Sequence, residues 1–81
     1  MTQAETIVRG FKFVVEAEGV KYWSSSVFTV TLEVHDSLTI NQTLIVYRDG
    51  DVVDTHRLTG TTRLQDLLLK SVRKSLAKKA I

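Results

Sequence analysis

Residues 43–56 read TLIVYRDGDVVDTH, and this stretch decides the fold. Apolar and polar side chains alternate on both sides of the pair Asp49-Gly50, as they do in half-buried strands. An Asp-Gly pair suits a type I′ turn, because both central residues of that turn need positive φ angles. We therefore predict a β-hairpin, with one strand over residues 38–48 and the next over residues 51–58.

A two-residue turn also predicts the register of this hairpin. Counting outward from the turn, Val46 faces Val53 on the core side, and Tyr47 meets Val52 on the outer side. In this register Asp54 lies on the outer, solvent-facing side of the second strand. His56, two residues further on, lies on the same side.

Two segments upstream of the hairpin show the same alternation, and both are predicted as strands. The first covers residues 6–18, with a bulge or bend where Gly10 follows Arg9. The second covers residues 21–35, after a turn at residues 18–19. The serines at 24–26 either extend this second strand or form a loop.

The C-terminal residues 62–79 predict one amphipathic helix. Thr62 and Gln65 have the spacing of a capping box, and Asp66 falls in the first turn, where the helix dipole favours a negative charge. One stripe repeats at helical spacing and comprises Leu64, Leu67, Leu68, Ser71, Val72, Ser75 and Leu76. The predicted fold is a single α+β domain over residues 1–81, a four-stranded antiparallel β-meander with this helix packed on one sheet face (ββββα).

Composition narrows the function classes. The chain has 81 residues and no cysteine, which excludes disulfides, thiol nucleophiles and zinc sites that need cysteine. The N-terminal residues lack the basic start and apolar run of a signal peptide. No apolar stretch approaches the roughly 20 residues that span a bilayer. We therefore predict a cytoplasmic protein with no membrane partner.

Positive charge is concentrated at the C-terminus. Residues 1–60 carry five Lys/Arg and eight Asp/Glu, whereas residues 61–81 carry six Lys/Arg and one Asp. At 100° per residue, most of these cations fall along one edge of the predicted helix. They are the candidate nucleic-acid-binding residues Arg63, Lys70, Arg73, Lys74 and Lys78. The alternative interpretation is a solvated helix face that keeps a small protein soluble.

The sequence offers little catalytic chemistry. His35 and His56, with Glu33 and Asp54, are predicted to share one open sheet face, where they could bind a metal or support acid–base chemistry. Their spacing matches no ligand signature, and a solvated polar face explains them as well. We predict no enzyme activity, no cofactor and no metal.

Three aromatic residues are candidates for a protein interface. Tyr22, Trp23 and Tyr47 are the residues expected to lie partly outside the core. Exposed aromatic side chains anchor protein interfaces or stack on single-stranded bases. Trp23, which is followed by three serines, favours a place in an interface or at the rim of the core over base stacking.

Two segments resemble fragments of double-stranded-RNA-binding domains, namely residues 27–34 (VFTVTLEV) and 74–80 (KSLAKKA). That family opens with a helix and places its lysine motif at the start of the final helix. This sequence predicts an opening strand and places the lysines at the end of the helix. We therefore do not assign the chain to that family.

These observations predict a small non-catalytic interaction domain that forms homo-oligomers and contacts a polyanion, with nucleic acid as the first candidate, through its basic helix edge. The alternative is a protein-binding accessory or inhibitor factor that docks through exposed aromatics and a sheet edge. Proline is absent, which removes one common guard against edge pairing, so a sheet continuous across a dimer is a further expectation.

Overall fold

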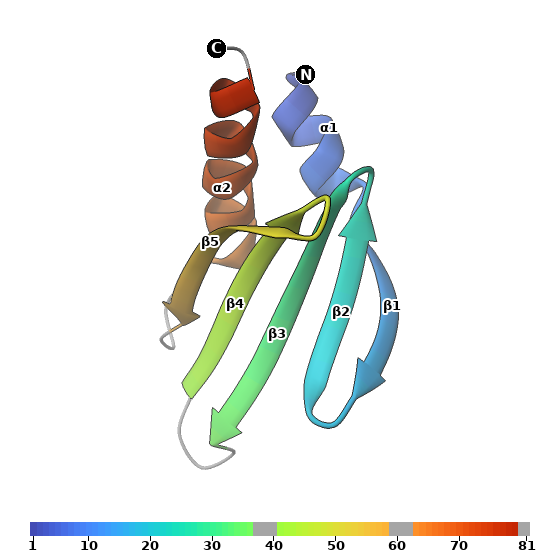
Figure 1. Cartoon of the computed structure of the whole chain (residues 1–81), viewed down its shortest axis with the longest axis vertical. Coiled ribbons are helices and arrows are strands. Elements are labelled where there is room, and N and C mark those ends of the chain that lie inside the picture. Colours follow the sequence, from blue (N-terminus) through green and yellow to red (C-terminus); the bar gives the residue numbers. More distant parts are fainter. Residues whose placement is uncertain (37–40, 59–62, 80–81) are drawn as a thin grey trace.

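The computed structural model describes residues 1–36, 41–58 and 63–79 and has two layers, a five-stranded antiparallel sheet and two helices on one of its faces (Figure 1). Each strand pairs with its neighbours in sequence, in the order β1-β2-β3-β4-β5. The elements are α1 (Gln3–Arg9), β1 (Lys12–Ala17), β2 (Val20–Ser25), β3 (Phe28–Asp36), β4 (Asn41–Arg48), β5 (Asp51–Leu58) and α2 (Leu64–Lys79). The α+β class is confirmed, but the predicted count of four strands is wrong.

The first difference lies at the N-terminus, where a helix replaces the start of the predicted strand over residues 6–18. Thr2 and Glu5 form a capping box, in which the Glu5 amide donates to Thr2 Oγ1 at 3.2 Å and the Thr2 amide donates to Glu5 Oε1 at 3.3 Å. The hydrogen bond from the Thr2 side chain is the main cause that lowers the pKa of the Glu5 carboxyl. Ala4 and Ile7 are buried on one side of α1. The alternation that predicted a strand therefore begins only at Lys12.

The bend predicted at Arg9 and Gly10 is the end of α1. Gly10 caps the helix, and Ser25 Oγ of β2 donates to the Ile7 carbonyl at 2.6 Å. A Cβ atom on Gly10 would lie 2.8 Å from Ser25 Oγ. Glycine is therefore needed here so that the end of α1 can approach β2 closely.

The second difference is that the predicted strand over residues 21–35 is two strands, β2 and β3. Ser26 adopts a positive φ of 55° and the chain turns at residues 26–27, whereas Ser24 and Ser25 belong to β2, so the serines partly extend the strand and partly form the turn. The Asp49-Gly50 turn is confirmed, with φ angles of 52° and 86°. A backbone hydrogen bond of 2.9 Å from the Asp49 amide to the Val27 carbonyl joins the two turns.

The third difference is the register between β4 and β5. Tyr47 pairs with Val52 as predicted, but a bulge follows, so that Val46 pairs with Asp54 instead of Val53. One extra residue in β5 reverses which side each later side chain faces. Asp54 and His56 therefore face the helices, and their predicted place on the outer side of the sheet is wrong.

The core lies between the two helices and the sheet. Among the described residues, nine apolar side chains are buried in it, namely Ala4, Ile7, Phe28, Val30, Leu32, Leu44, Val46, Leu58 and Val72. The stripe predicted for α2 faces this core, because Leu67, Leu68 and Leu76 pack against it. Thr62, the predicted cap of α2, lies outside the described residues. An opening helix removes one of the two differences from double-stranded-RNA-binding domains, but the lysines still lie at the end of α2.

Replacement of the α1 cap tests the unexpected helix. Thr2→Ala removes the side chain that accepts from the Glu5 amide and should lower the free energy of unfolding by about 1 kcal/mol. Urea denaturation followed by circular dichroism measures this loss. Gln3→Ala, an exposed change in the same turn, is the matched control and should cost nothing. Equal effects of the two substitutions would contradict the capped helix.

Candidate functional site

One face of the sheet carries no helix in the described part of the chain (Figure 1). Side chains alternate along each strand, so the strand register shows which residues share this face. We define the open face as Lys12, Val15, Ala17, Val20, Tyr22, Ser24, Thr29, Thr31, Glu33, Thr43, Ile45, Tyr47, Val52, Thr55 and Arg57. Its charged members lie in the two outer rows of paired residues. The middle row, which crosses the sheet from Val15 through Thr31 to Thr55, is uncharged.

The open face brings together two of the three aromatic residues predicted for an interface. Tyr22 of β2 and Tyr47 of β4 line one shallow hollow of about 400 Å³, on either side of Thr29 and Thr31. Thr31, at the centre of the face, is buried. Trp23 follows Tyr22 directly in an extended strand and therefore faces the helices, so the structure separates it from the tyrosines.

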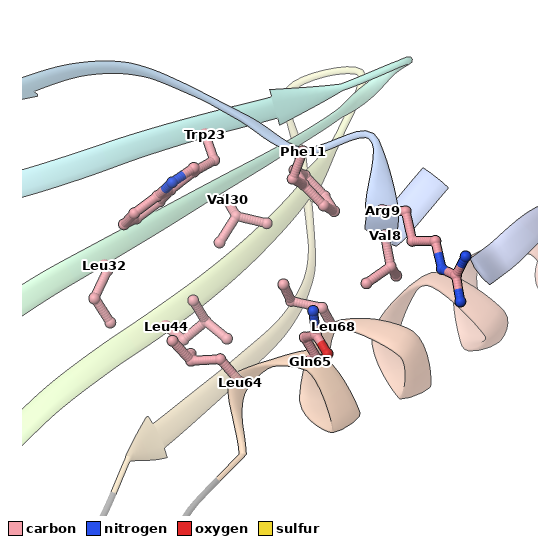
Figure 2. Close-up of a pocket in the computed structure, with 10 residues that line it drawn as sticks. All are labelled: Val8, Arg9, Phe11, Trp23, Val30, Leu32, Leu44, Leu64, Gln65 and Leu68. Atoms are coloured by element: carbon pink, nitrogen blue, oxygen red, sulfur yellow. The ribbon is translucent and has the colours of Figure 1, made fainter. Parts of the chain in front are cut away.

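On the helix side Trp23 lines a second concavity, which we call the groove (Figure 2). The groove lies between the end of α1, the first turns of α2 and the sheet, and has a volume of about 390 Å³. Its lining residues are Val8, Arg9, Phe11, Trp23, Val30, Leu32, Leu44, Leu64, Gln65 and Leu68. These residues come from six elements or connections, so sequence reasoning missed the groove. The signal that could have found it is the pair of aromatics, Phe11 and Trp23, beside strong apolar periodicity.

The edge strand β1 borders the groove and exposes three consecutive apolar residues. Phe13, Val14 and Val15 are 56%, 59% and 46% exposed. The Phe13 ring meets Trp23 edge to face, with centroids 5.8 Å apart. A register shift between Phe13 and Val15 marks a bulge in β1, and bulges at sheet edges disfavour the pairing of another strand.

Polar residues of β5 and α2 form a network where α2 packs on the sheet. Ser71 Oγ donates to Asp54 Oδ2 at 3.0 Å and lies 2.8 Å from His56 Nε2. Since the one hydroxyl proton goes to Asp54, the Nε2 atom of His56 must carry a proton and donate to Ser71. Lys74 Nζ donates to Asp54 Oδ1 at 3.4 Å. The network thus explains why a buried serine lies in the stripe of α2.

Ser75, the other buried serine of the stripe, also has a hydrogen-bond partner on the sheet. The Arg48 guanidinium donates to the Ser75 hydroxyl at 2.9 Å and to the Ser75 carbonyl at 3.0 Å. It also lies 5.5 Å from the centre of the Phe28 ring. Ser71 and Ser75 therefore fix α2 over β4 and β5 through directional bonds, in addition to apolar packing.

The Asp54 network has the residue types of a nucleophilic triad but a different geometry. In a triad the carboxylate bonds the ring nitrogen opposite the serine, and the serine hydroxyl is accessible. Here Asp54 Oδ2 lies 3.4 Å from Nε2, the nitrogen that also meets Ser71, and Ser71 is fully buried. The arrangement therefore stabilises the helix–sheet interface and presents no nucleophile.

Electrostatics favour an ionised Asp54. Partial burial raises the pKa of the Asp54 carboxyl, but hydrogen bonds from Ser71 and Lys74 and the electrostatic influence of His56 and Lys74 outweigh it. The net effect is a pKa below the ordinary value for aspartate. A depressed carboxyl pKa stabilises the fold above the pKa of the unfolded chain, and this contribution is lost as the pH falls through the folded pKa.

The predicted face with both histidines does not form, since Asp54 and His56 face α2. His35 lies in β3, but its side chain is outside the described part. Within residues 1–36, 41–58 and 63–79, no group of three or more histidine, cysteine or acidic side chains is placed to hold a metal ion.

The five predicted nucleic-acid-binding residues lie on α2 or just before it, but they do not form one cluster. Arg63, Lys70 and Lys74 are exposed along one edge of the buried stripe, from which Lys74 reaches Asp54 of β5, whereas Arg73 lies toward α1 and helps to lower the pKa of Glu5. Lys78 borders a hollow with Asp49 and Asp51. Within the described residues, Lys74 is the one member of the five in an ion pair, with Asp54.

The described helices are too short or too polar to cross a membrane. In comparisons with known proteins, no family model matches the chain, and neither the curated proteins nor the solved structures give a match.

The charge on Asp54 can be tested directly. Asp54→Asn keeps the shape of the side chain but removes the charge that Lys74 and His56 face, and should cost about 1 kcal/mol at pH 7. The difference in unfolding free energy between the two proteins should be full above about pH 4 and narrow below it, as Asp54 becomes protonated. Urea titrations from pH 2 to pH 7 measure it. Asp51→Asn, an exposed change on the same strand, is the control. A difference in unfolding free energy that does not depend on pH would contradict an ionised Asp54 in the folded protein.

Proposed function

We propose that this chain is a non-catalytic binding domain that self-associates, with the open faces of two copies packed against each other. The observation that carries the proposal is the uncharged middle row of the open face, which includes Tyr22 and has Tyr47 beside it. The face of a sheet that meets water usually carries polar side chains, but here valine, isoleucine and tyrosine side chains lie among its serine and threonine residues. An uncharged surface with partly exposed aromatic side chains is typical of the centre of a protein interface.

The charge distribution of the open face suits contact with a second copy. A self-packed interface brings identical residues near one another, so charges at its centre would repel or lose their hydration. The charged members Lys12, Glu33 and Arg57 lie in the outer rows, where the rim of an interface remains in water. Two antiparallel sheets packed in this way lie about 10 Å apart.

Pairing of β1 edges is the competing mode of self-association. The bulge in β1 and the charge on Lys12 both hinder the addition of a strand there. The open face lacks such obstacles at its centre. The proposal therefore places the interface on the face of the sheet and leaves β1 at its edge.

A cytoplasmic location belongs to the same proposal. The chain has no cysteine, and proteins of reducing compartments do not depend on disulfides.

Sedimentation equilibrium tests the interface. The unchanged protein should dimerise, and Tyr22→Glu with Tyr47→Glu should weaken the dimer at least about 30-fold, because a single aromatic anchor already carries about 2 kcal/mol or more. Phe13→Glu is the matched control, since it makes the same kind of change on the edge strand β1. A thermal melt of each variant separates lost association from lost folding.

Two results would reject this interface. One is a protein that stays monomeric at about 200 μM, where a dimer of moderate affinity would be populated. The other is a dimer that Phe13→Glu weakens while the tyrosine changes leave it intact, which would place the interface at the β1 edge.

We propose contact with a polyanion, nucleic acid first, as a second function of α2. It is supported by the exposed positions of Arg63 and Lys70, with no ion pair to either in the described part of the chain. In a dimer packed through the open faces, the α2 helices of the two copies would lie on the two outer sides. Each copy would then present its cations to a separate stretch of phosphates.

Salt dependence is the test of this second function. Arg63→Ala with Lys70→Ala should weaken binding to a 20-base-pair DNA duplex and reduce the slope of log affinity against log salt by about 2, since each phosphate contact contributes about 0.9. Lys12→Ala with Lys21→Ala removes the same charge from the sheet and should leave the slope unchanged. Equal slopes for the α2 variant and the unchanged protein would reject phosphate contact by α2.

A further inference from the structure

We infer that the groove is a binding site for a small ligand with an apolar body and one anionic group. The groove lies on the helix side of the sheet, so it is separate from the open face and from the proposed dimer interface (Figure 2). Its volume of about 390 Å³ falls within the 300–1,000 Å³ typical of small-molecule sites.

The walls of the groove determine the apolar part of the ligand. Eight of its ten lining residues are apolar, and Trp23 and Phe11 provide two aromatic surfaces. The sheet supplies the floor through Val30, Leu32 and Leu44, which are all buried. Such a surface gains most by covering a compact hydrocarbon or aromatic group, because that contact removes apolar area from water on both sides.

The two polar lining residues determine the other end of the ligand. Arg9, the last residue of α1, and Gln65, in the first turn of α2, are the polar members of the lining. Figure 2 shows Arg9 beside Val8, at the other end of the groove from Trp23 and Leu32. A guanidinium binds carboxylate or sulfonate oxygens through parallel hydrogen bonds, and a glutamine amide can donate one more. An anionic head at this end would therefore leave the apolar body against Trp23.

The surroundings of Arg9 determine how strongly the groove prefers an anionic ligand over a neutral one. Arg9 also borders the hollow between the two helices, together with Glu5 and Asp66. These carboxylates offset part of its charge, and Arg9 is itself exposed to screening solvent. We therefore expect Arg9 to favour an anion over a neutral analogue by a few-fold and the apolar walls to supply most of the affinity.

The protein contains its own reporter, because Trp23 is its one tryptophan and lies in the groove. The probes are 8-anilinonaphthalene-1-sulfonate and its neutral analogue N-phenyl-1-naphthylamine, which have the same aromatic body and differ in the sulfonate. Both should quench Trp23 emission with saturation, and decanoate should displace them. Leu64→Gln, which makes a half-exposed wall polar, should weaken both probes at least about 5-fold.

Arg9→Gln tests how the groove recognises the anionic group, independently of its contact with the apolar body. It should weaken the sulfonate probe about 3- to 5-fold and leave the neutral probe unchanged. Arg73→Gln, an exposed change on α2 outside the groove, is the matched control and should affect neither probe. The Tyr22→Glu, Tyr47→Glu variant should bind both probes as the unchanged protein does. The test of ligand binding in the groove is therefore independent of the test of the dimer.

Three results would overturn this inference. The first is the absence of saturable quenching below about 1 mM of either probe. The second is unchanged binding by Leu64→Gln in a variant that still melts cooperatively, which would place the probes elsewhere. The third is an equal loss of affinity for both probes in Arg9→Gln, which would show that Arg9 does not recognise the anionic group.

Discussion

The bulge between β4 and β5 is the constraint on which the helix–sheet interface depends. One additional residue opposite Val46 turns Asp54 and His56 toward α2, where they meet Ser71. Without it, the same side chains would face water, and the hydroxyl of Ser71 would be buried with no partner from the strand. The irregularity therefore converts a polar edge strand into the surface that receives the long helix.

The two faces of the sheet consequently have different chemistry. The helix side combines an apolar core with directional polar bonds at Arg48 and Asp54, and it leaves a groove where the short α1 does not extend over the strands. The open face has one shallow hollow, which Tyr22 and Tyr47 line, and no charge across its middle row. A domain of this size can thus present one surface suited to a flat protein partner and a separate concavity suited to a small molecule.

The parts of the fold that follow local rules could be predicted from the sequence. The Asp49-Gly50 turn needs two positive φ angles, and the stripe of α2 follows helical spacing, so both were recognised. The helix α1 was missed although Thr2 and Glu5 carry a capping box, because seven residues provide too few apolar positions to compete with the alternation that follows. The turn at Ser26 was ambiguous because it lacks the glycine or asparagine that normally marks a positive φ.

The candidate sites were predictable only in part, because local sequence rules do not specify every feature that places their residues. Residue type alone indicated Tyr22, Trp23 and Tyr47, and strict alternation already implies that neighbours at 22 and 23 face opposite sides. The place of Asp54 could not be predicted, since nothing in the sequence of β5 marks a bulge. The groove needs α1, which was not expected, so the aromatic pair Phe11 and Trp23 could not be assigned to a groove from the sequence.

The neighbour-to-neighbour order of the strands has a consequence for the folding of the chain. All five strands pair with partners adjacent in sequence, so the sheet can form hairpin by hairpin as the chain leaves the ribosome. The contact of α1 with α2 joins the two ends of the sequence. Until α2 has emerged, α1 and the inner face of the sheet remain uncovered, so protection of the core from other nascent chains comes only with the last element of this domain.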